Sequence, residues 1–275
     1  MGSTGKCGWR STAASRSTTS ARRGKRARIP SSRVPRSSVR TTTPPRSRRC
    51  ARRLPDSDVR PGYDAYLFDL DGTLVDTAPD IMAGLNVTLT EYGHGAVDEA
   101  RTRDWVGRGV GPLIRLALRH HGQPEPPPDV TDGMIERFRD YYARHIADRG
   151  GPYPGVREAL DGLHGRAALG VVTNKPGRLT GLLLDALDLS GYFGVVVAGD
   201  TLPVAKPAPD PALHACETLG VEARRALFVG DSTTDVACAR AAGCDVVCVS
   251  YGYRAGARPE DLGADRIVDS LTALI

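Results

Sequence analysis

The first 55 residues of the chain contain no Asp or Glu, although they carry 16 of its 37 Lys and Arg residues. The rest of the chain therefore has 21 basic against 32 acidic residues, and the formal net charge of +5 comes from the N-terminal segment. Because that charge is not on the part of the chain with a folding pattern, it does not indicate a nucleic-acid-binding fold.

The sequence also lacks the features of membrane proteins and of disulfide-rich proteins. It has no run of about eighteen apolar residues and no apolar segment typical of a secretory signal. Its six cysteines form no C-x-x-C pair and no cluster with His, and we expect Cys238, Cys244 and Cys248 to be core residues. We therefore expect no membrane span and a location in the reducing cytoplasm.

Residues 1–60 are rich in Arg, Ser, Thr and Pro and show no apolar periodicity. Such a segment cannot bury enough apolar surface to offset its chain entropy, so we expect a disordered basic tail. Three explanations stay open, in this order: a translation artefact upstream of the real start, an organellar targeting peptide, and a basic arm that binds polyanions. A nucleic-acid-binding protein acting through this tail is the alternative from a different functional class, and nucleic acid is not the expected partner.

Two patterns divide the remainder of the chain. Residues 79–152 have apolar positions at helical spacing, which predicts a small all-helical domain, called the cap below, whose first helix begins with a capping box from Thr77 to Asp80. Residues 61–78 and 153–275 alternate short apolar runs with helical segments, which predicts a parallel sheet covered on both faces. The expected strands are 63–68, 169–173, 195–198, 226–230, 246–250 and 266–268. The predicted fold class is therefore α/β, a Rossmann-like parallel sheet core with an inserted helical cap.

Two acids follow the first predicted strand. Asp69 and Asp71 start on the same side of the chain, because side chains of a strand alternate with a period of two. Neighbouring carboxylates repel each other unless a cation neutralises them, and a hard divalent ion such as Mg²⁺ suits oxygen ligands. A solvated Asp-x-Asp-Gly turn would be the better interpretation if this motif stood alone.

The motif does not stand alone, because polar residues also follow the other predicted strands. In chain order they are Thr173, Asn174, Lys206, Asp231 and Asp235. Taken singly, Thr173 reads as the N-cap of the next helix, and Ser232 with Asp235 as a capping box. Taken together, they bring acids, a hydroxyl and an ammonium to the edge of a parallel sheet where ligands bind. That set suits metal-assisted phosphoryl transfer.

These motifs resemble those of the haloacid dehalogenase-like hydrolase superfamily over roughly residues 61–275. The resemblance rests on Asp69-Leu70-Asp71-Gly72-Thr73, Thr173, Lys206-Pro207 and Gly230-Asp231-Ser232-x-x-Asp235. A narrower similarity, to bacterial phosphoglycolate phosphatases, rests on Trp105-Val106-Gly107-Arg108-Gly109, Val172-Thr173-Asn174-Lys175-Pro176, Gly199-Asp200-Thr201-Leu202-Pro203, Ala242-Gly243-Cys244 and Tyr251-Gly252-Tyr253. Arg108 departs from that pattern, in which Asn is expected, and it lies in the predicted cap.

The resemblance implies a Mg²⁺-dependent phosphatase that hydrolyses a small phosphorylated metabolite, most specifically 2-phosphoglycolate, to glycolate and phosphate. It implies that Asp69 is the nucleophile that forms an aspartyl-phosphate and that Asp71 is the general acid and base. It further implies the following roles. Asp69, Asp71 through its backbone carbonyl, and Asp231 would bind Mg²⁺; Thr173, Asn174 and Lys206 would bind the phosphoryl group; and Asp235 would support them.

Arg108 is a candidate for substrate selection by the cap on the basis of its own sequence context. It lies in a loop with glycines at 107, 109 and 111, and its guanidinium can donate two hydrogen bonds to a carboxylate. A solvated surface Arg is the alternative interpretation.

Other functions with the same fold stay open. A sugar phosphomutase and a broad-specificity sugar or nucleotide phosphatase share every core motif, so only the cap and a product assay separate them. A dehalogenase is disfavoured because Asp71 supplies an acid that carbon–halogen cleavage does not need. The sequence leaves the oligomeric state open.

Overall fold

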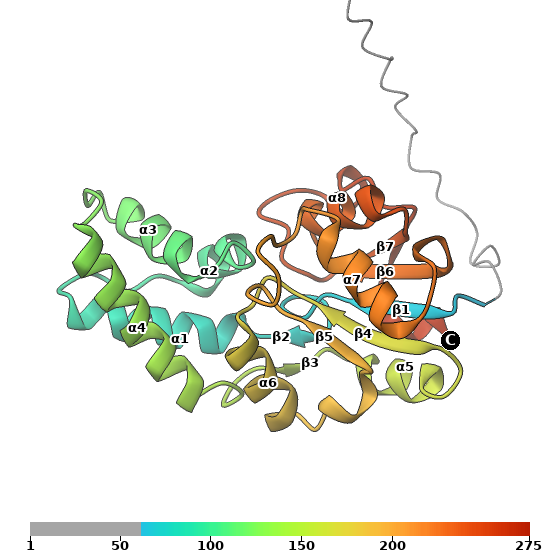
Figure 1. The fold of residues 1–275 in the computed structure, drawn as a ribbon. Coiled ribbons are helices and arrows are strands. Elements are labelled where there is room, and N and C mark those ends of the chain that lie inside the picture. Colours follow the sequence, from blue (N-terminus) through green and yellow to red (C-terminus); the bar gives the residue numbers. More distant parts are fainter. Residues whose placement is uncertain (1–61) are drawn as a thin grey trace, which may run out of the picture. The chain divides into compact units, whose positions relative to one another are not determined.

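The computed structural model describes residues 62–275, so the predictions made for residues 1–60 lie outside the described residues. Within this range strands alternate with helices along most of the chain (Figure 1). The strands are β1 (Ala65–Phe68), β2 (Val75–Asp76), β3 (Gly151–Pro152), β4 (Ala168–Val172), β5 (Val195–Val197), β6 (Ala226–Gly230), β7 (Asp245–Val249) and β8 (Arg266–Val268). The α-helices are α1 (Ala78–Glu91), α2 (Glu99–Trp105), α3 (Val110–His120), α4 (Pro128–Arg144), α5 (Val156–Leu163), α6 (Gly177–Ala186), α7 (Asp210–Leu219) and α8 (Thr233–Ala242). Short 3-10 turns are η1 (Ser190–Tyr192), η2 (Ala223–Arg225), η3 (Pro259–Asp261) and η4 (Leu271–Leu274).

Six strands form one parallel sheet in the order β5-β4-β1-β6-β7-β8. In its centre, Phe68 of β1 is in register with Val171 of β4 and with Val229 of β6. The direction of winding reverses between β1 and β6, which is the point where such sheets bind ligands outside their carboxyl ends. The predicted α/β fold is confirmed, and every predicted strand is present within two residues of its expected bounds.

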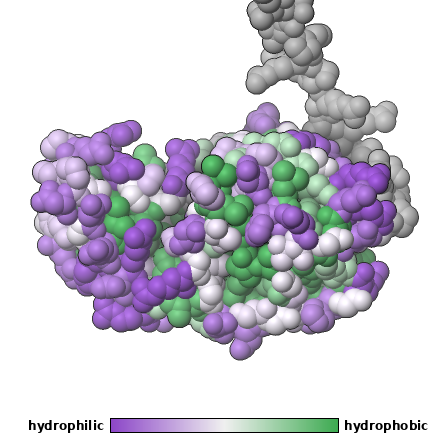
Figure 2. Space-filling view, viewed as in Figure 1, coloured by the Kyte–Doolittle hydropathy of each residue, from purple (hydrophilic) through white to green (hydrophobic). Residues whose placement is uncertain are grey.

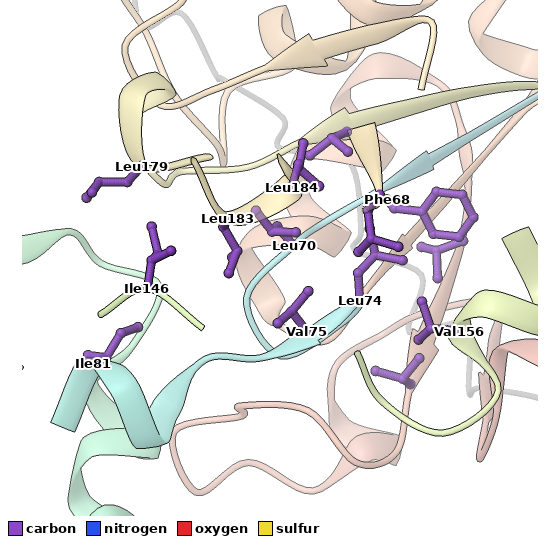
Figure 3. Packing of buried hydrophobic residues seen from close by; sticks show 14 of the residues in the cluster. Phe68, Leu70, Leu74, Val75, Ile81, Ile146, Val156, Leu179, Leu183 and Leu184 are labelled. Atoms are coloured by element: carbon purple, nitrogen blue, oxygen red, sulfur yellow. The ribbon is translucent and has the colours of Figure 1, made fainter. Parts of the chain in front are cut away.

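The side chains of the central strands alternate between two hydrophobic clusters, one on each face of the sheet. Phe68 belongs to the cluster that α5 and α6 cover, part of which Figure 3 shows, whereas Leu67 belongs to the cluster that α7 and α8 cover. Because both faces are covered, these strands are continuous apolar runs and not alternating ones. Phe228 of β6 is fully buried, and truncating such a ring to Ala costs about 3–5 kcal/mol.

The cysteines of the described residues lie inside the protein. Cys216, Cys238, Cys244 and Cys248 are buried and form no disulfide. Cys238, Cys244 and Cys248 belong to the cluster under α7 and α8, which confirms the prediction that they are core residues. None of the helices in residues 62–275 combines the length and the apolar character needed to cross a membrane.

Helices α1 to α4 follow one another between β2 and β3, and we call them the helical insert. In Figure 1 they lie beside the sheet and pack on one another. Their apolar residues, among them Leu85 of α1, Ile114 of α3 and Phe138 of α4, are buried. On the face drawn in Figure 2 hydrophilic residues cover much of α3 and α4. The division into a core (61–78 and 153–275) and a cap (79–152) stays a prediction.

The two segments that connect the helical insert to the sheet are tied to each other. β2 and β3 pair antiparallel, a short sheet that sequence patterns did not indicate because each strand has two residues. The Asp80 carboxylate accepts hydrogen bonds from the backbone N–H groups of Arg149, at 3.0 Å, and Gly150, at 2.8 Å. The capping box predicted from Thr77 to Asp80 is therefore wrong, because Asp80 binds the second connection and the Thr77 hydroxyl has no partner within residues 62–275.

Candidate active site

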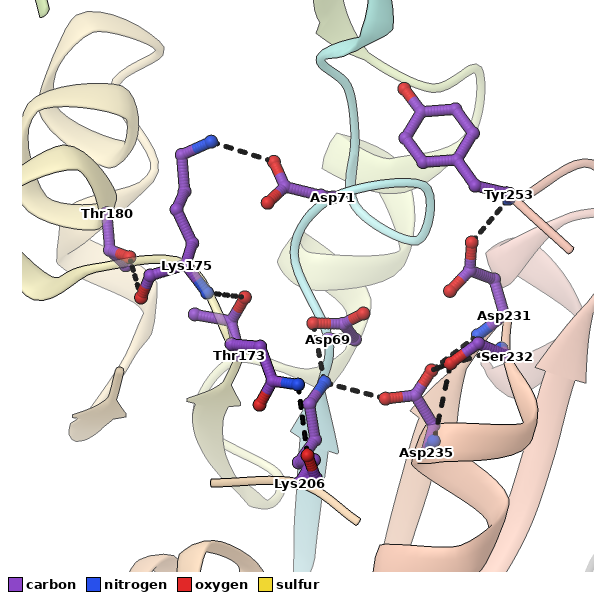
Figure 4. Close-up of polar contacts among 11 residues, drawn as sticks. Asp69, Asp71, Thr173, Lys175, Thr180, Lys206, Asp231, Ser232, Asp235 and Tyr253 are labelled. Carbon is purple, nitrogen blue, oxygen red and sulfur yellow. Dashed lines mark hydrogen bonds and ion pairs between the residues drawn. The ribbon is translucent and has the colours of Figure 1, made fainter. Parts of the chain in front are cut away.

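The polar residues predicted from the strand ends line one cavity of about 40 Å³ at the carboxyl edge of the sheet. The predicted site residues among its lining are Asp69, Asp71, Thr173, Asn174, Lys206, Asp231 and Asp235. They come from the ends of β1, β4 and β6, the start of α8 and the loop between β5 and α7, as Figure 4 shows for most of them. Arg108 is exposed and does not line this cavity. The roles assigned to all these residues stay predictions.

The Lys206 ammonium lies between two carboxylates in the centre of the site (Figure 4). Its Nζ is 2.7 Å from Asp69 Oδ1 and 2.6 Å from Asp235 Oδ1. The backbone N–H of Asp69 donates to the Val229 carbonyl oxygen at 2.9 Å, which fixes the turn after β1 to β6. Because all three side chains are buried, these ion pairs are little screened by solvent.

Both oxygens of the Asp235 carboxylate already accept hydrogen bonds from the protein. Besides Lys206 at Oδ1, its Oδ2 accepts from the backbone N–H groups of Asp231, at 3.2 Å, and Ser232, at 3.1 Å, and from the Ser232 hydroxyl at 2.6 Å. The capping box of Ser232 and Asp235 is thus present at the start of α8. Asp235 therefore orients Lys206 and the backbone of Asp231.

Three buried carboxylates lie together near the Lys206 ammonium in this cavity, and the Lys175 ammonium, which also lines it, pairs with a fourth, Asp71. Asp69, Asp231 and Asp235 offer carboxylate oxygens within 4.8 Å of one another. Burial raises the pKa of Asp69 to about 7 even though Lys206 favours its ionised form, and burial together with Asp235 and Asp69 raises the pKa of Asp231 well above its usual value. A divalent cation would balance this excess of negative charge, and all the donors are hard oxygens. The cluster thus fits a metal ion. Asp69 and Asp231 are the better ligands, because Asp235 accepts four hydrogen bonds from the protein.

We expect Mg²⁺ to stabilise the protein more at pH 8 than at pH 5. The pKa of Asp69 is about 7 in the folded protein against 3.8 without the fold, so between these values the folded state binds a proton that the unfolded state lacks. Stability of the ion-free protein therefore falls as pH rises through this window, and a cation that favours the carboxylate removes the loss. Thermal unfolding with and without Mg²⁺ at both pH values measures the effect. An equal shift at pH 5 and pH 8 contradicts it.

Close backbone packing holds the Asp231 side chain. Its Oδ2 accepts a hydrogen bond from the backbone N–H of Tyr253. The Tyr253 hydroxyl donates to Asp76 Oδ1 at 2.6 Å and accepts from the Ala78 backbone N–H at 2.8 Å. Gly72 has φ +89°, and a Cβ there would lie 2.3 Å from Asp231 Oδ2. Asp231 is thereby fixed between the turn after β1 and the first connection to the helical insert.

Replacing Gly72 by Ala tests this packing, and Gly93→Ala is the matched control. Both glycines have positive φ, at +89° and +78°, but a Cβ at Gly93 would meet nothing within 4 Å. Each change therefore costs about 1–2 kcal/mol of stability from backbone conformation. Only Gly72→Ala also displaces Asp231, so we expect its Mg²⁺-induced rise in Tm to be lost while that of Gly93→Ala persists. Equal Mg²⁺ responses in the two variants contradict this account of Asp231.

The loop after β4 has a different structure from the one expected. The α6 helix begins at Gly177, so the prediction that Thr173 is its N-cap is wrong. Three residues separate Thr173 from the first residue of the helix, so its hydroxyl cannot cap it. The hydroxyl instead accepts a hydrogen bond from the backbone N–H of Lys175 at 3.2 Å. Asn174 Nδ2 donates to the Lys206 carbonyl oxygen at 3.1 Å, which joins this loop to the one that carries Lys206.

Sequence analysis gave no role to Lys175, which is buried in the site. Its Nζ lies 3.0 Å from Asp71 Oδ1 and 2.8 Å from the hydroxyl of Tyr142 in α4. The position of Lys175 beside Thr173 and Asn174 at a strand end could have indicated it. Nothing could have indicated Tyr142, because it has the spacing of an ordinary core residue of an amphipathic helix.

The parallel sheet carries a buried site with acids and lysines at the point where the strand order changes direction. This combination is typical of hydrolases with an α/β fold. Residues 66–249 match the sequence profile of the haloacid dehalogenase-like hydrolases. A phosphoglycolate phosphatase of Nitrosococcus oceani is 41% identical over 209 residues, 76% of this chain and 93% of that protein. One of Cupriavidus necator is 44% identical over 211 residues, 76% of this chain and 90% of that protein.

A solved structure of a related protein has the same fold. The crystal structure of a predicted phosphoglycolate phosphatase from Haemophilus somnus superimposes with a TM-score of 0.73 at 31% identity, covering 77% of this chain and 96% of that one. The chain belongs to the haloacid dehalogenase-like hydrolase family, as its motifs predicted.

Proposed function

We propose that this protein is a Mg²⁺-dependent phosphatase that hydrolyses 2-phosphoglycolate to glycolate and phosphate. The observation that carries the proposal is the contact of Lys206 with Asp69, next to Asp231 and Asp71, in one buried cavity. That arrangement supplies a nucleophile, an acid and a positive charge for a phosphoryl group. The names of the relatives from Nitrosococcus oceani and Cupriavidus necator support the choice of substrate.

In the first step a carboxylate oxygen of Asp69 attacks phosphorus, and the bond from phosphorus to the ester oxygen breaks. The Lys206 ammonium, the Thr173 hydroxyl and the Asn174 side chain line the same cavity and would bind the phosphoryl oxygens, whose charge they would stabilise. Asp71 gives its proton to the departing alkoxide, which leaves as the hydroxyl of glycolate.

In the second step Asp71 takes a proton from a water molecule, whose oxygen attacks phosphorus. The bond between phosphorus and Asp69 then breaks, and free phosphate leaves with Asp69 again ionised. Asp69, the Asp71 backbone carbonyl and Asp231 would hold Mg²⁺, which when bound offsets negative charge on the phosphoryl group. Asp235 keeps Lys206 in place throughout.

The helical insert acts in this proposal as a cap over the site. Val106 and Gly107, which follow α2, line the same cavity as the acids from the sheet. A cap in this position excludes water and selects the leaving group, with Arg108 as the candidate from sequence. We further infer that the enzyme works on a small phosphorylated metabolite in the cytoplasm, and the free cysteines are consistent with a reducing compartment.

Phosphate release from a panel of small esters tests the proposal. We expect 2-phosphoglycolate to have the highest kcat/KM, ahead of glucose phosphates and nucleoside monophosphates. If a hexose phosphate or a nucleotide is hydrolysed more efficiently, the protein is a sugar or nucleotide phosphatase of the same fold. Conversion of a sugar 1-phosphate to its 6-phosphate without phosphate release identifies a phosphomutase instead.

A further inference from the structure

A second cavity, of about 50 Å³, adjoins the first on the side of the helical insert. Asp71, Val106, Gly107, Asn174 and Lys175 line both cavities, so the two lie next to each other at these residues. The rest of its wall is mostly apolar. It is formed by Ile81, Trp105, Gly109, Val110, Leu113, Phe138, Tyr142, Pro176 and Leu179. If the phosphoryl group binds beside Asp69 as proposed, this second cavity receives the leaving group.

Lys175 is the only cationic side chain among the described residues that line the second cavity. Its ammonium has three N–H groups, of which two face Asp71 Oδ1 and the Tyr142 hydroxyl. It also lies over the Tyr142 ring, 4.6 Å from the centroid. Among the described residues the third N–H has no acceptor, which leaves it for a ligand in the cavity.

The apolar wall and the single ammonium together favour a leaving group with one carboxylate over one with several hydroxyls. A leaving group with several hydroxyls would lose hydrogen bonds to water without replacing them on this wall. A leaving group with one carboxylate finds a charge-assisted donor in the buried ammonium of Lys175. Arg108, the candidate from sequence, is exposed and lines neither cavity.

We propose that Lys175 binds the carboxylate of the leaving group and thereby selects phosphate esters of small hydroxy acids. The inference rests on the proposed phosphatase activity and adds to it the residue that discriminates between substrates. Lys175 is supplied by the loop after β4 and Tyr142 by α4, so the carboxylate is bound where the sheet and the helical insert meet.

The test compares kcat/KM for 2-phosphoglycolate with kcat/KM for 2-hydroxyethyl phosphate, an ester of similar size whose leaving group has a hydroxyl in place of the carboxylate. In Lys175→Met and Lys175→Gln we expect the ratio of the two values to fall about 10- to 100-fold, the loss of one charge-assisted hydrogen bond. Arg178→Met removes an exposed cation three residues further on and should leave the ratio unchanged. Thermal unfolding confirms that each variant is folded.

The ratio of the two kcat/KM values distinguishes a role of Lys175 in substrate recognition from a purely structural role. If Lys175 only supports the fold or Asp71, both esters lose activity together, the ratio stays constant and the inference is overturned. The inference is also overturned if Arg108→Ala, and not a change of Lys175, removes the preference for 2-phosphoglycolate. It is overturned as well if the wild-type enzyme hydrolyses both esters equally. In both cases the proposed phosphatase activity still stands. A wild-type protein that releases phosphate from neither ester overturns the proposed function and this inference with it.

Discussion

Asp69→Asn should reduce turnover by about 10⁴-fold or more, because the amide has nearly the shape of the carboxylate but cannot attack phosphorus. The protein should remain folded. Burial already raises the pKa of Asp69 to about 7, which means that its charge is costly in this cavity. A neutral side chain removes that cost, so we expect the Tm without Mg²⁺ to stay the same or to rise.

Asp132→Asn is the matched control for this variant. Asp132 is exposed on α4, and the same change there should leave both kcat and Tm as in the wild type. Initial rates with 2-phosphoglycolate, measured on protein that was purified free of host phosphatases, give the comparison. Turnover by Asp69→Asn within tenfold of the wild-type rate contradicts the role of Asp69 as nucleophile.

Removal of divalent cations should abolish activity. Asp69, Asp231 and Asp235 place three carboxylates around one ammonium, and without a cation two of these acids have raised pKa values. A phosphoryl group brings still more negative charge into the same cavity, so the ion-free site should bind substrate poorly. Dialysis against excess EDTA should lower the rate to background.

Addition of Mg²⁺ beyond the EDTA concentration should restore the rate, which separates loss of the ion from irreversible unfolding. Asp231→Asn should need far more Mg²⁺ for half-maximal activity than the wild type, because it loses one of the carboxylates with a free oxygen. Full activity in excess EDTA, with the metal content checked by elemental analysis, contradicts a metal-dependent mechanism.

The parts of the site that follow parallel strands could be predicted because the topology places them together. Asp69, Thr173 and Asp231 lie far apart in sequence, but the carboxyl ends of β1, β4 and β6 meet at one edge of the sheet. Recognising these strands as continuous apolar runs was therefore sufficient to expect one site. The same argument placed Lys206 there, although it comes from a loop, because that loop follows β5.

Contacts between the helical insert and the sheet could not be predicted in this way. Tyr142 has helical spacing and reads as a core residue, and only the packing of α4 brings its hydroxyl to Lys175. Asp80 had a local partner in the pattern of a capping box, but two backbone N–H groups about seventy residues away bind it instead. Local patterns give the partners that a residue can have, and tertiary packing decides between them.

The most direct test of the account is the position of the phosphoryl group during turnover. The enzyme is mixed with saturating 2-phosphoglycolate and Mg²⁺, quenched in acid within one turnover, and mapped by peptide mass spectrometry. The account predicts one phosphoryl group on Asp69, on the peptide that contains β1, and none in Asp69→Asn. A phosphoryl group on another residue, or the same labelling in wild type and Asp69→Asn, contradicts it.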